Sequence, residues 1–193
     1  MIKTVRDAWK IPELRKKILF TIFALLIFRL GAAIPVPYIN SQELEVYLAA
    51  QSGTILGLMN AMSGSAFSMA TLFALSIQPY INSSIIIQLL TVAIPALERM
   101  AKEGGEEGRK KIASWTRYVG VLLGLLQGLS YYALLRNQGF LSDKGVLAAV
   151  TIIMTFTAGT ALIMWMGEHI TQKGIGNGIS IILFAGIVSR GPS

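Results

Sequence analysis

The chain has 193 residues, of which 53% are hydrophobic and 14% are charged, and its formal net charge is +7. Soluble domains usually carry about 25% charged residues, so this composition excludes a disordered chain, a coiled coil and an ordinary cytosolic enzyme. It indicates a membrane protein. Cysteine is absent and His169 is the single histidine, so the sequence predicts no disulfide, no metal site and no cofactor.

The first predicted span covers residues 18–38 and follows a basic N-terminal segment, residues 1–17. A basic start, an apolar core and small residues also occur in secretory signals. Arg29 interrupts this core, however, and no soluble domain follows it, which favours a retained span. Arg29 lies about 9 Å of helix rise from Pro35, so we expect its side chain to snorkel to the outer surface.

A 52-residue stretch between Glu45 and Glu98 carries no charge and is too long for one helix. Its first part, residues 52–70, is weakly hydrophobic and contains several glycines and serines. Lipid cannot satisfy irregular backbone, so such a segment enters a membrane only where protein or water surrounds it. Two interpretations stay open: a short re-entrant half-helix, or an external loop that rests on the other helices.

The second part of the stretch, residues 71–94, is long enough for a full span. Pro79 lies in its first third, where the missing N–H should kink the helix. Asn82 and Gln88 are among several polar side chains at membrane depth, and these should face other helices or water. Contacts between helices are the common explanation for such residues, and the lining of a polar path is the functional alternative.

Two pairs of apolar residues share an i, i+4 spacing: Ile77 with Ile81, and Ile179 with Leu183. The members of each pair lie on one face of their helix. Pairs on two different helices can together form an apolar constriction, although ordinary packing explains most pairs with this spacing.

Three more spans are predicted at residues 116–135, 145–167 and 175–191. The first of them contains two overlapping GxxxG units, which predict close helix–helix packing. The glycine-rich run 174–178 lacks the spacing of a nucleotide-binding loop, and it predicts a tight turn into the last span. The glycines of the GxxxG units are Gly120, Gly124 and Gly128.

Basic residues predict the orientation of the chain. Thirteen of the 17 lysines and arginines lie before the first span, in or beside the loop 95–115, or in the loop 168–174. The opposite loops and the end of the chain hold Arg136, Lys144 and Arg190. Cytoplasmic loops carry such an excess, so the N-terminus and both basic loops are predicted to be cytoplasmic. The surplus needs no nucleic-acid binding, and the lack of acidic residues inside the spans disfavours an ion-coupled carrier.

Three longer motifs are distinctive. They are Ile77-Gln-Pro-Tyr-Ile-Asn-Ser-Ser-Ile-Ile-Ile-Gln-Leu-Leu90, Gly108-Arg-Lys-Lys-Ile112 with Thr116-Arg-Tyr118, and Gly167-Glu-His-Ile-Thr-Gln-Lys-Gly-Ile-Gly-Asn-Gly-Ile-Ser180. In these motifs the chain resembles the SecY family, the channel subunits of the bacterial protein-export translocon, and the resemblance covers essentially the whole chain.

The resemblance implies an all-α polytopic membrane fold with about five transmembrane helices and a short re-entrant plug helix, which together form half of an inverted-repeat channel. It also implies three sets of site residues. The pore ring corresponds to Ile77, Ile81, Ile179 and Leu183. One wall of the lateral gate corresponds to Asn82, Ile85 and Gln88. The plug, near residues 52–70, corresponds to Ile55, Leu58, Met59, Met62 and Phe67.

The function implied by the resemblance is secretion of unfolded polypeptides across the bacterial plasma membrane and insertion of helices into it, with signal sequences binding at the gate. The implied partners are SecE- and SecG-type small membrane subunits, a SecA-type motor ATPase or a ribosome, the nascent or secretory polypeptide, and lipid. The chain has no nucleotide-binding motif and is not expected to be an enzyme. A complete family member has ten spans, so we expect a second SecY half in the same chain or in another.

Two functions of other classes stay open. The first is a small homo-oligomeric five-helix transporter or ion channel, and the second is a purely structural scaffold subunit. Saturable solute flux through this chain alone would indicate the first. Export that is insensitive to changes at Asn82 and Gln88 would indicate the second.

Overall fold

The computed structural model describes residues 11–51 and 53–189, and within these ranges it is helical, with turns and two isolated β-bridges but no β-strand. The helices range from 8 to 34 residues in length. Their bounds are α2 (Pro12–Gly31), α3 (Ser41–Ala50), α4 (Ile55–Met62), α5 (Gln78–Ala93), α6 (Pro95–Lys102), α7 (Gly105–Gln138), α8 (Val146–Lys173) and α9 (Gly178–Val188).

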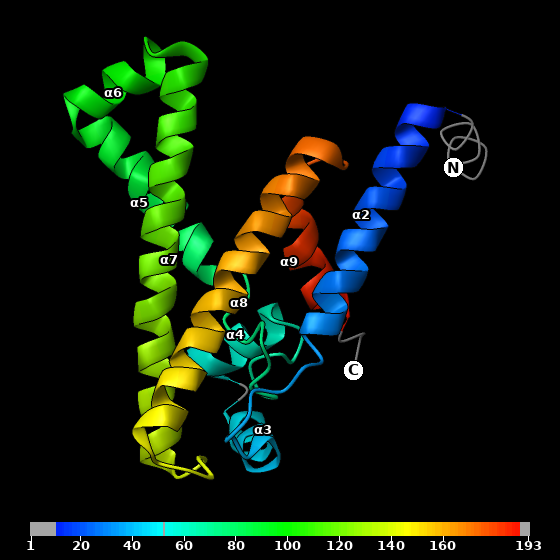
Figure 1. Cartoon of the computed structure of the whole chain (residues 1–193), viewed down its shortest axis with the longest axis vertical. Helices are drawn as coiled ribbons and strands as arrows, with labels where there is room; N and C mark the ends of the chain where they lie inside the picture. Colours follow the sequence, from blue (N-terminus) through cyan, green and yellow to red (C-terminus); the bar gives the residue numbers. More distant parts are fainter. Residues whose placement is uncertain (1–10, 52, 190–193) are drawn as a thin grey trace.

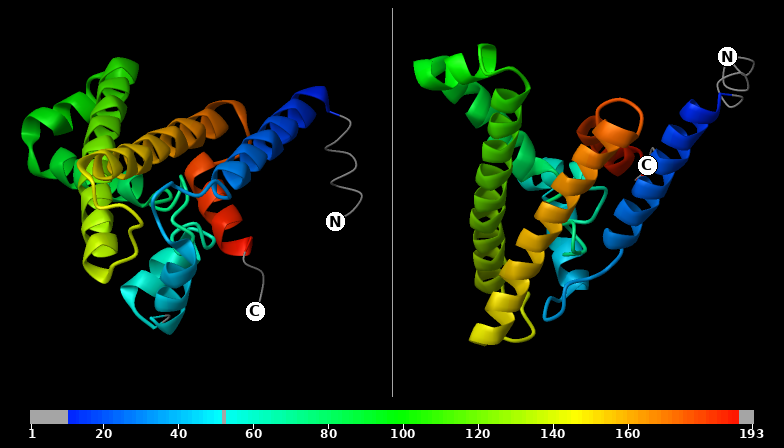
Figure 2. Two further views of the ribbon diagram at one scale, coloured as in Figure 1. Left: turned by 60° about the horizontal axis from the view of Figure 1, so that its bottom comes forward. Right: turned by 45° about the horizontal axis from the view of Figure 1, so that its top comes forward.

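The two longest helices, α7 and α8, form a hairpin on which α2, α5, α6 and α9 pack (Figure 1). α5 packs on α7, α9 packs on α8, and α2 contacts both α8 and α9. The short helix α4 contacts α3 and α9. Figure 2 shows α3 near the end of the molecule at which α8 begins.

Membrane-crossing length is reached by two of the described helices, α7 and α8, and by a third if the bent pair α5 and α6 counts as one span. At 1.5 Å per residue, the 34 residues of α7 extend about 51 Å, beyond the roughly 30 Å of a bilayer core. α2 has 20 residues, four of them basic, and α9 has 11. The fold is thus all-α and polytopic, whereas the number of five spans stays a prediction.

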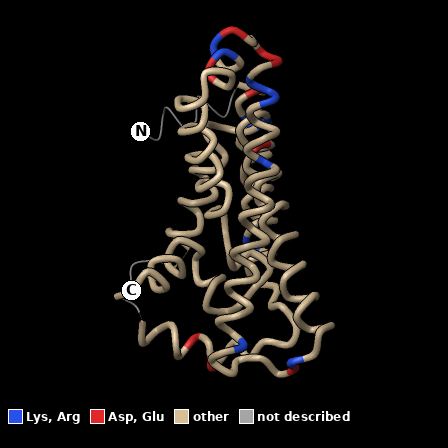
Figure 3. The backbone as a smooth tube through the Cα atoms, turned by 90° about the vertical axis from the view of Figure 1, so that its left-hand side faces the viewer, with Lys and Arg blue, Asp and Glu red and all other residues tan. Residues whose placement is uncertain are grey.

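Most charged residues of the described chain lie toward its two ends, and the middle is nearly free of them (Figure 3). This distribution agrees with a protein whose middle crosses lipid, because buried or lipid-facing charges are costly there. The largest group of charges surrounds the turn between α6 and α7 (Figure 3).

Close packing of α7 on α8 occurs at the GxxxG glycines. A Cβ atom at Gly120 would lie 2.8 Å from the sulfur of Met164, and one at Gly124 would lie 3.0 Å from Cγ2 of Thr160. Both distances are shorter than ordinary van der Waals contact, so the two helices approach where side chains are missing. The prediction of close packing from this motif is confirmed.

The segment 71–94 differs from its prediction. The helix begins only at Gln78, so Pro79 lies in its first turn and does not kink it. A proline is tolerated there because the first N–H groups of a helix have no partner inside it. The sharp bend occurs instead before Pro95, where α6 leaves α5 at an angle of 103°.

Two predicted loops are also largely helical. Residues 95–115 form α6 and the first turns of α7, and α8 continues to Lys173 through most of the loop 168–174. α6 is amphipathic, and its Leu97 and Met100 line a small apolar cavity of about 130 Å³ together with residues of α5 and α7. In the sequence, Glu98, Arg99 and Lys102 conceal the apolar spacing of α6.

Helix α3 was not foreseen from the sequence. Its Leu44 and Leu48, one turn apart, are both essentially buried, so a single apolar stripe attaches this short helix to the core. Two isolated backbone bridges, Pro35 with Thr71 and Ile39 with Leu141, connect the segments next to it.

A candidate pore ring, plug and gate

The four residues of the predicted pore ring lie in one apolar cluster. Ile77 precedes α5 and is 1% exposed, and Ile81 follows one turn later. Ile179 and Leu183 lie one turn apart on α9. Ile81, Ile179 and Leu183 are half-buried and pack against the cluster that contains Ile77. Two pairs about a hundred residues apart in the sequence therefore pack on the same apolar cluster.

The position of α9 is set by the glycine-rich turn before it. Asn177 caps the helix, because its side-chain oxygen accepts hydrogen bonds from the N–H groups of Ile179 and Ser180 at 3.0 and 3.3 Å. A Cβ atom at Gly178 would overlap the carbonyl oxygen of Gly167 on α8. The turn was predicted from its glycines, and its tightness is explained by this backbone contact.

The candidate plug is defined here as α4 with the turns that follow it, residues 55–70. Its polar side chains brace it internally: Asn60 accepts a hydrogen bond from the Ser68 N–H at 2.9 Å. The Ser63 hydroxyl accepts from the Phe67 N–H at 3.0 Å and donates to the Asn60 carbonyl, also at 3.0 Å. The serines that make this segment weakly hydrophobic thus satisfy its irregular backbone.

The five predicted plug residues do not form one unit. Ile55 and Leu58 are 78% and 61% exposed, whereas Met59 and Met62 are half-buried. Phe67 is buried, and its ring stacks on Tyr131 of α7 with centroids 4.5 Å apart. The Tyr131 hydroxyl also donates a hydrogen bond to the Phe67 carbonyl. Tyr131 therefore anchors the candidate plug, and sequence reasoning missed it because no local pattern relates residues so far apart.

Replacing Tyr131 with phenylalanine is expected to loosen this anchor. The buried Phe67 carbonyl loses one of its two donors and keeps the Ala70 N–H at 3.2 Å. The loss costs about 1 kcal/mol, so amide hydrogen exchange in residues 60–70 should accelerate about fivefold. Tyr118→Phe is the control, since Tyr118 is 76% exposed. Equal exchange in both variants would contradict the anchoring role.

The three predicted gate residues share the open face of α5. Asn82 is half-buried, Ile85 is 49% exposed and Gln88 is exposed. On the opposite face, Ser83 and Ile87 are buried. Ser83 lies against Gly120 of α7, where a Cβ atom would come within 3.1 Å of its hydroxyl. Among the polar residues of α5, Ser83 therefore contacts α7, whereas Asn82 and Gln88 lie on a face that no helix of the described chain covers.

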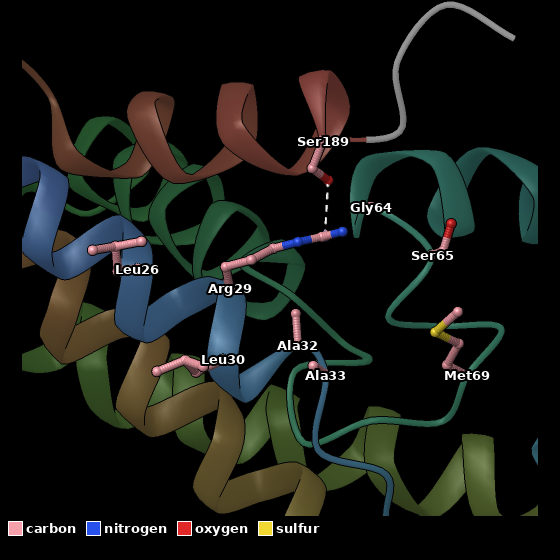
Figure 4. A pocket seen from close by; sticks show the side chains of 9 residues that line it. All are labelled: Leu26, Arg29, Leu30, Ala32, Ala33, Gly64, Ser65, Met69 and Ser189. Carbon is pink, nitrogen blue, oxygen red and sulfur yellow. Dashed lines mark hydrogen bonds between the residues drawn. The ribbon is translucent and has the colours of Figure 1, made fainter.

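Arg29 is exposed, as is Ser189. Its guanidinium Nη1 donates to the hydroxyl of Ser189, after the end of α9, at 3.1 Å (Figure 4). Its partner Ser189 is 160 residues away in the sequence, so the sequence did not indicate this contact, and snorkelling to the outer surface stays a prediction.

No metal site is formed within residues 11–51 and 53–189, where no three His, Cys, Asp or Glu side chains lie close enough to hold an ion. Glu168 instead pairs with Arg117, with Nε and Oε1 2.7 Å apart, and joins α8 to α7. The Arg117 side chain is half exposed, so this pair contributes at most about 1 kcal/mol.

The same fold occurs in solved protein-conducting channels. The chain is similar to Sec61 in a canine ribosome–channel complex from the endoplasmic reticulum and to a structure described as a protein conducting channel. Each match has a TM-score of 0.61 at 20% identity and covers 89% of this chain and 36% of the other. By its fold, the chain is a polytopic α-helical membrane protein.

Sequence comparison then identifies the family. The SecY family model matches residues 71–193. Protein translocase subunit SecY from Escherichia coli K12 is 47% identical over 184 residues, and the match covers 93% of this chain and 41% of the relative. For SecY of Streptomyces griseus the values are 44% identity, 100% of this chain and 46% of the relative. The chain belongs to the SecY family.

The relatives are longer than this chain. It spans about half the length of the curated relatives that it matches, from 41% in Escherichia coli K12 to 51% in a Buchnera aphidicola SecY. The residues described above therefore correspond to part of a SecY subunit.

Proposed function

We propose that this chain forms half of a channel that conducts unfolded polypeptides across the bacterial plasma membrane and releases helices into it. The observation that carries the proposal is the single apolar cluster that contains Ile77 and against which Ile81, Ile179 and Leu183 pack. It is supported by membership of the SecY family and by the short braced helix beside this cluster.

The proposed mechanism is physical rather than covalent. A narrow apolar ring sheds water when it is empty, which limits the leakage of ions, and it accepts any side chain because it makes no specific polar contact. Ile81, Ile179 and Leu183 are half-buried in the described chain, so each keeps surface that can face a passing polypeptide. The remainder of the ring would come from a second SecY half, in the same chain or in another.

The open face of α5 is assigned to one wall of the lateral gate. Asn82 and Gln88 lie on this face with Ile85 between them, so the wall is partly polar. A partly polar wall keeps the closed gate marginally stable, and an apolar signal sequence that binds there shifts the equilibrium toward the open gate.

The driving force and the partners are assigned to other proteins. A SecA-type motor ATPase or a ribosome would supply energy, and SecE- and SecG-type subunits would support the channel. Support comes from the canine relative of this fold, which is described in a ribosome–channel complex. The N-terminus and the turn between α6 and α7 are assigned to the cytoplasm because basic residues gather in both.

Crosslinking in the assembled complex tests the pore assignment. The chain has no cysteine, so Ile81→Cys or Leu183→Cys introduces its only thiol, and a stalled secretory polypeptide should crosslink to each. Leu122→Cys is the control, because Leu122 is 57% exposed on α7 and outside the cluster. Absence of crosslinks at positions 81 and 183 would overturn the assignment, and saturable solute flux from this chain alone would favour the transporter alternative.

A further inference from the structure

The ends of two helices meet beside the candidate plug. Arg29, in the last turn of α2, donates to Ser189, the residue after the end of α9, at 3.1 Å. A cavity of about 690 Å³ borders this hydrogen bond, and Gly64 and Ser65 of the candidate plug line it on the far side. Figure 4 shows the Arg29 side chain extending from α2 toward Ser189 and Gly64.

Ser189 connects Arg29 to a backbone contact of the plug. While it accepts from Arg29, its hydroxyl donates to the carbonyl oxygen of Gly186 at 2.7 Å. A Cβ atom at Gly64 would lie 2.6 Å from both that oxygen and the Ser189 hydroxyl. From the other side, a Cβ atom at Gly186 would lie 2.7 Å from the Met62 carbonyl. The backbone of the plug at Gly64 therefore packs against the Gly186 carbonyl oxygen and the Ser189 hydroxyl, and the hydroxyl is the group that accepts from Arg29.

Glycine suits the plug at this point for two reasons. Gly64 has a φ of +64°, which side chains disfavour, and no space is left for a Cβ atom. Any shift of the end of α9 is therefore transmitted directly to the turn.

A cation is also suited to this position. The last carbonyl groups of a helix lack partners inside it and carry the negative end of the helix dipole. Arg29 brings its charge to that end of α9, and its planar group has five N–H donors.

On its other side the candidate plug is held by Tyr131, through Phe67. Its own hydrogen bonds brace the plug internally. Besides the contacts with α7 and α9, it packs on α3, and its Ala70 carbonyl accepts a hydrogen bond from the Val36 N–H at 3.0 Å.

The attachment to α7 is the buried contact of Phe67 with Tyr131. The attachment to α9 is the contact of Gly64 with Gly186 and Ser189, which depends on the hydrogen bond between Arg29 and Ser189.

We propose that Arg29 and Ser189 form a latch that keeps the candidate plug seated in the resting channel. By holding the end of α9 against Gly64, they act as positioning residues. When α2 and α9 separate, the hydrogen bond breaks and the plug loses this attachment. The inference rests on the proposed channel function, because it concerns how that channel stays closed.

The test measures whether the plug stays seated in the assembled complex without any substrate. Ala66 belongs to the plug, is 1% exposed and packs in the same apolar cluster as Ile77, so Ala66→Cys becomes accessible only when the plug moves. We expect Arg29→Gln or Ser189→Ala to raise its labelling rate with a membrane-impermeant maleimide about five- to tenfold, as for the loss of one charge-assisted hydrogen bond.

Three controls make the result specific. The double variant should label no faster than the faster single variant, because both changes remove the same interaction. Ser189→Thr keeps the hydroxyl and should label as the unmodified latch does. Arg136→Gln removes an arginine from the end of α7 and should have no effect.

Unchanged labelling in both Arg29→Gln and Ser189→Ala would overturn the latch, as would single effects that multiply in the double variant. Since labelling is measured at rest, this outcome is independent of polypeptide transport. Failure of the crosslinks at positions 81 and 183 would overturn the channel function separately.

Discussion

Replacing Gly178 with alanine is expected to destabilise the complex by about 1–3 kcal/mol. The added Cβ atom would overlap the Gly167 carbonyl oxygen and lie 2.7 Å from Cβ of Ile170. All three residues belong to the contact between α8 and α9, where the nearest atoms are backbone and cannot turn aside. The two helices must therefore separate, and Ile179 and Leu183 would move with α9 away from the apolar cluster.

Helix propensity alone predicts the opposite sign, because alanine favours a helix over glycine by about 1 kcal/mol. Gly128→Ala is the matched control: it also lies in a helix, but its Cβ atom would have its nearest neighbour at an ordinary 3.6 Å. The measurement is the thermal unfolding midpoint of the complex in detergent. Gly178→Ala should lower the midpoint by about 2–10 °C, whereas Gly128→Ala should leave it unchanged or raise it. A raised midpoint for Gly178→Ala would show that α8 and α9 are not in close backbone contact.

Replacing Asn82 and Gln88 together with leucine is expected to slow the export of proteins with weak signal sequences at least about tenfold. Both side chains lie on the open face of α5. Leucines there would favour the closed gate, because they would be exposed to water when it opens. Each exposure costs about 1 kcal/mol, which is part of the free energy of transferring a whole leucine side chain into water. Two such costs correspond to a population shift of more than tenfold.

Export should be measured for a weak and a strong signal sequence in parallel. A strong signal binds the open gate more tightly and compensates for the shift, so its export should change much less. Ser130→Leu is the control, since Ser130 is exposed on α7 and lies outside the gate face. Equal export of the weak signal in the double variant and the control would favour the scaffold alternative.

Local sequence patterns predicted the features that depend on neighbours along the chain. The GxxxG glycines identified the face of α7 that packs on α8, because residues four apart share a helix face wherever the helix lies. The i, i+4 spacing identified both apolar pairs for the same reason. Spacing alone left ordinary packing as the commoner explanation, and the structure adds that both pairs belong to one cluster.

Predictions failed where the start of a helix or a distant partner was decisive. In a helix that began at residue 71, Pro79 would cause a kink. The helix begins at Gln78, so Pro79 lies in its first turn. The turns before Gln78 are held by contacts with other segments. The segment 95–115 is predicted to be a cytoplasmic loop between two spans. Its charges gave no sign that Pro95 begins an amphipathic helix whose apolar side packs on α5 and α7. In both segments tertiary packing determines where the helix begins, and the composition is compatible with more than one starting residue.

The sequence by itself determined that this is a membrane protein, because it combines charge-free segments long enough to cross a bilayer with a share of charged residues, 14%, well below that of soluble domains. It also determined the resemblance to the SecY family, because the three long motifs are continuous or nearly continuous in the sequence. Only the tertiary structure decided what holds the candidate plug: Tyr131 on one side, and Gly186 with the Arg29–Ser189 pair on the other. These contacts join residues that are far apart in the sequence, and such contacts have no period or spacing from which they can be read.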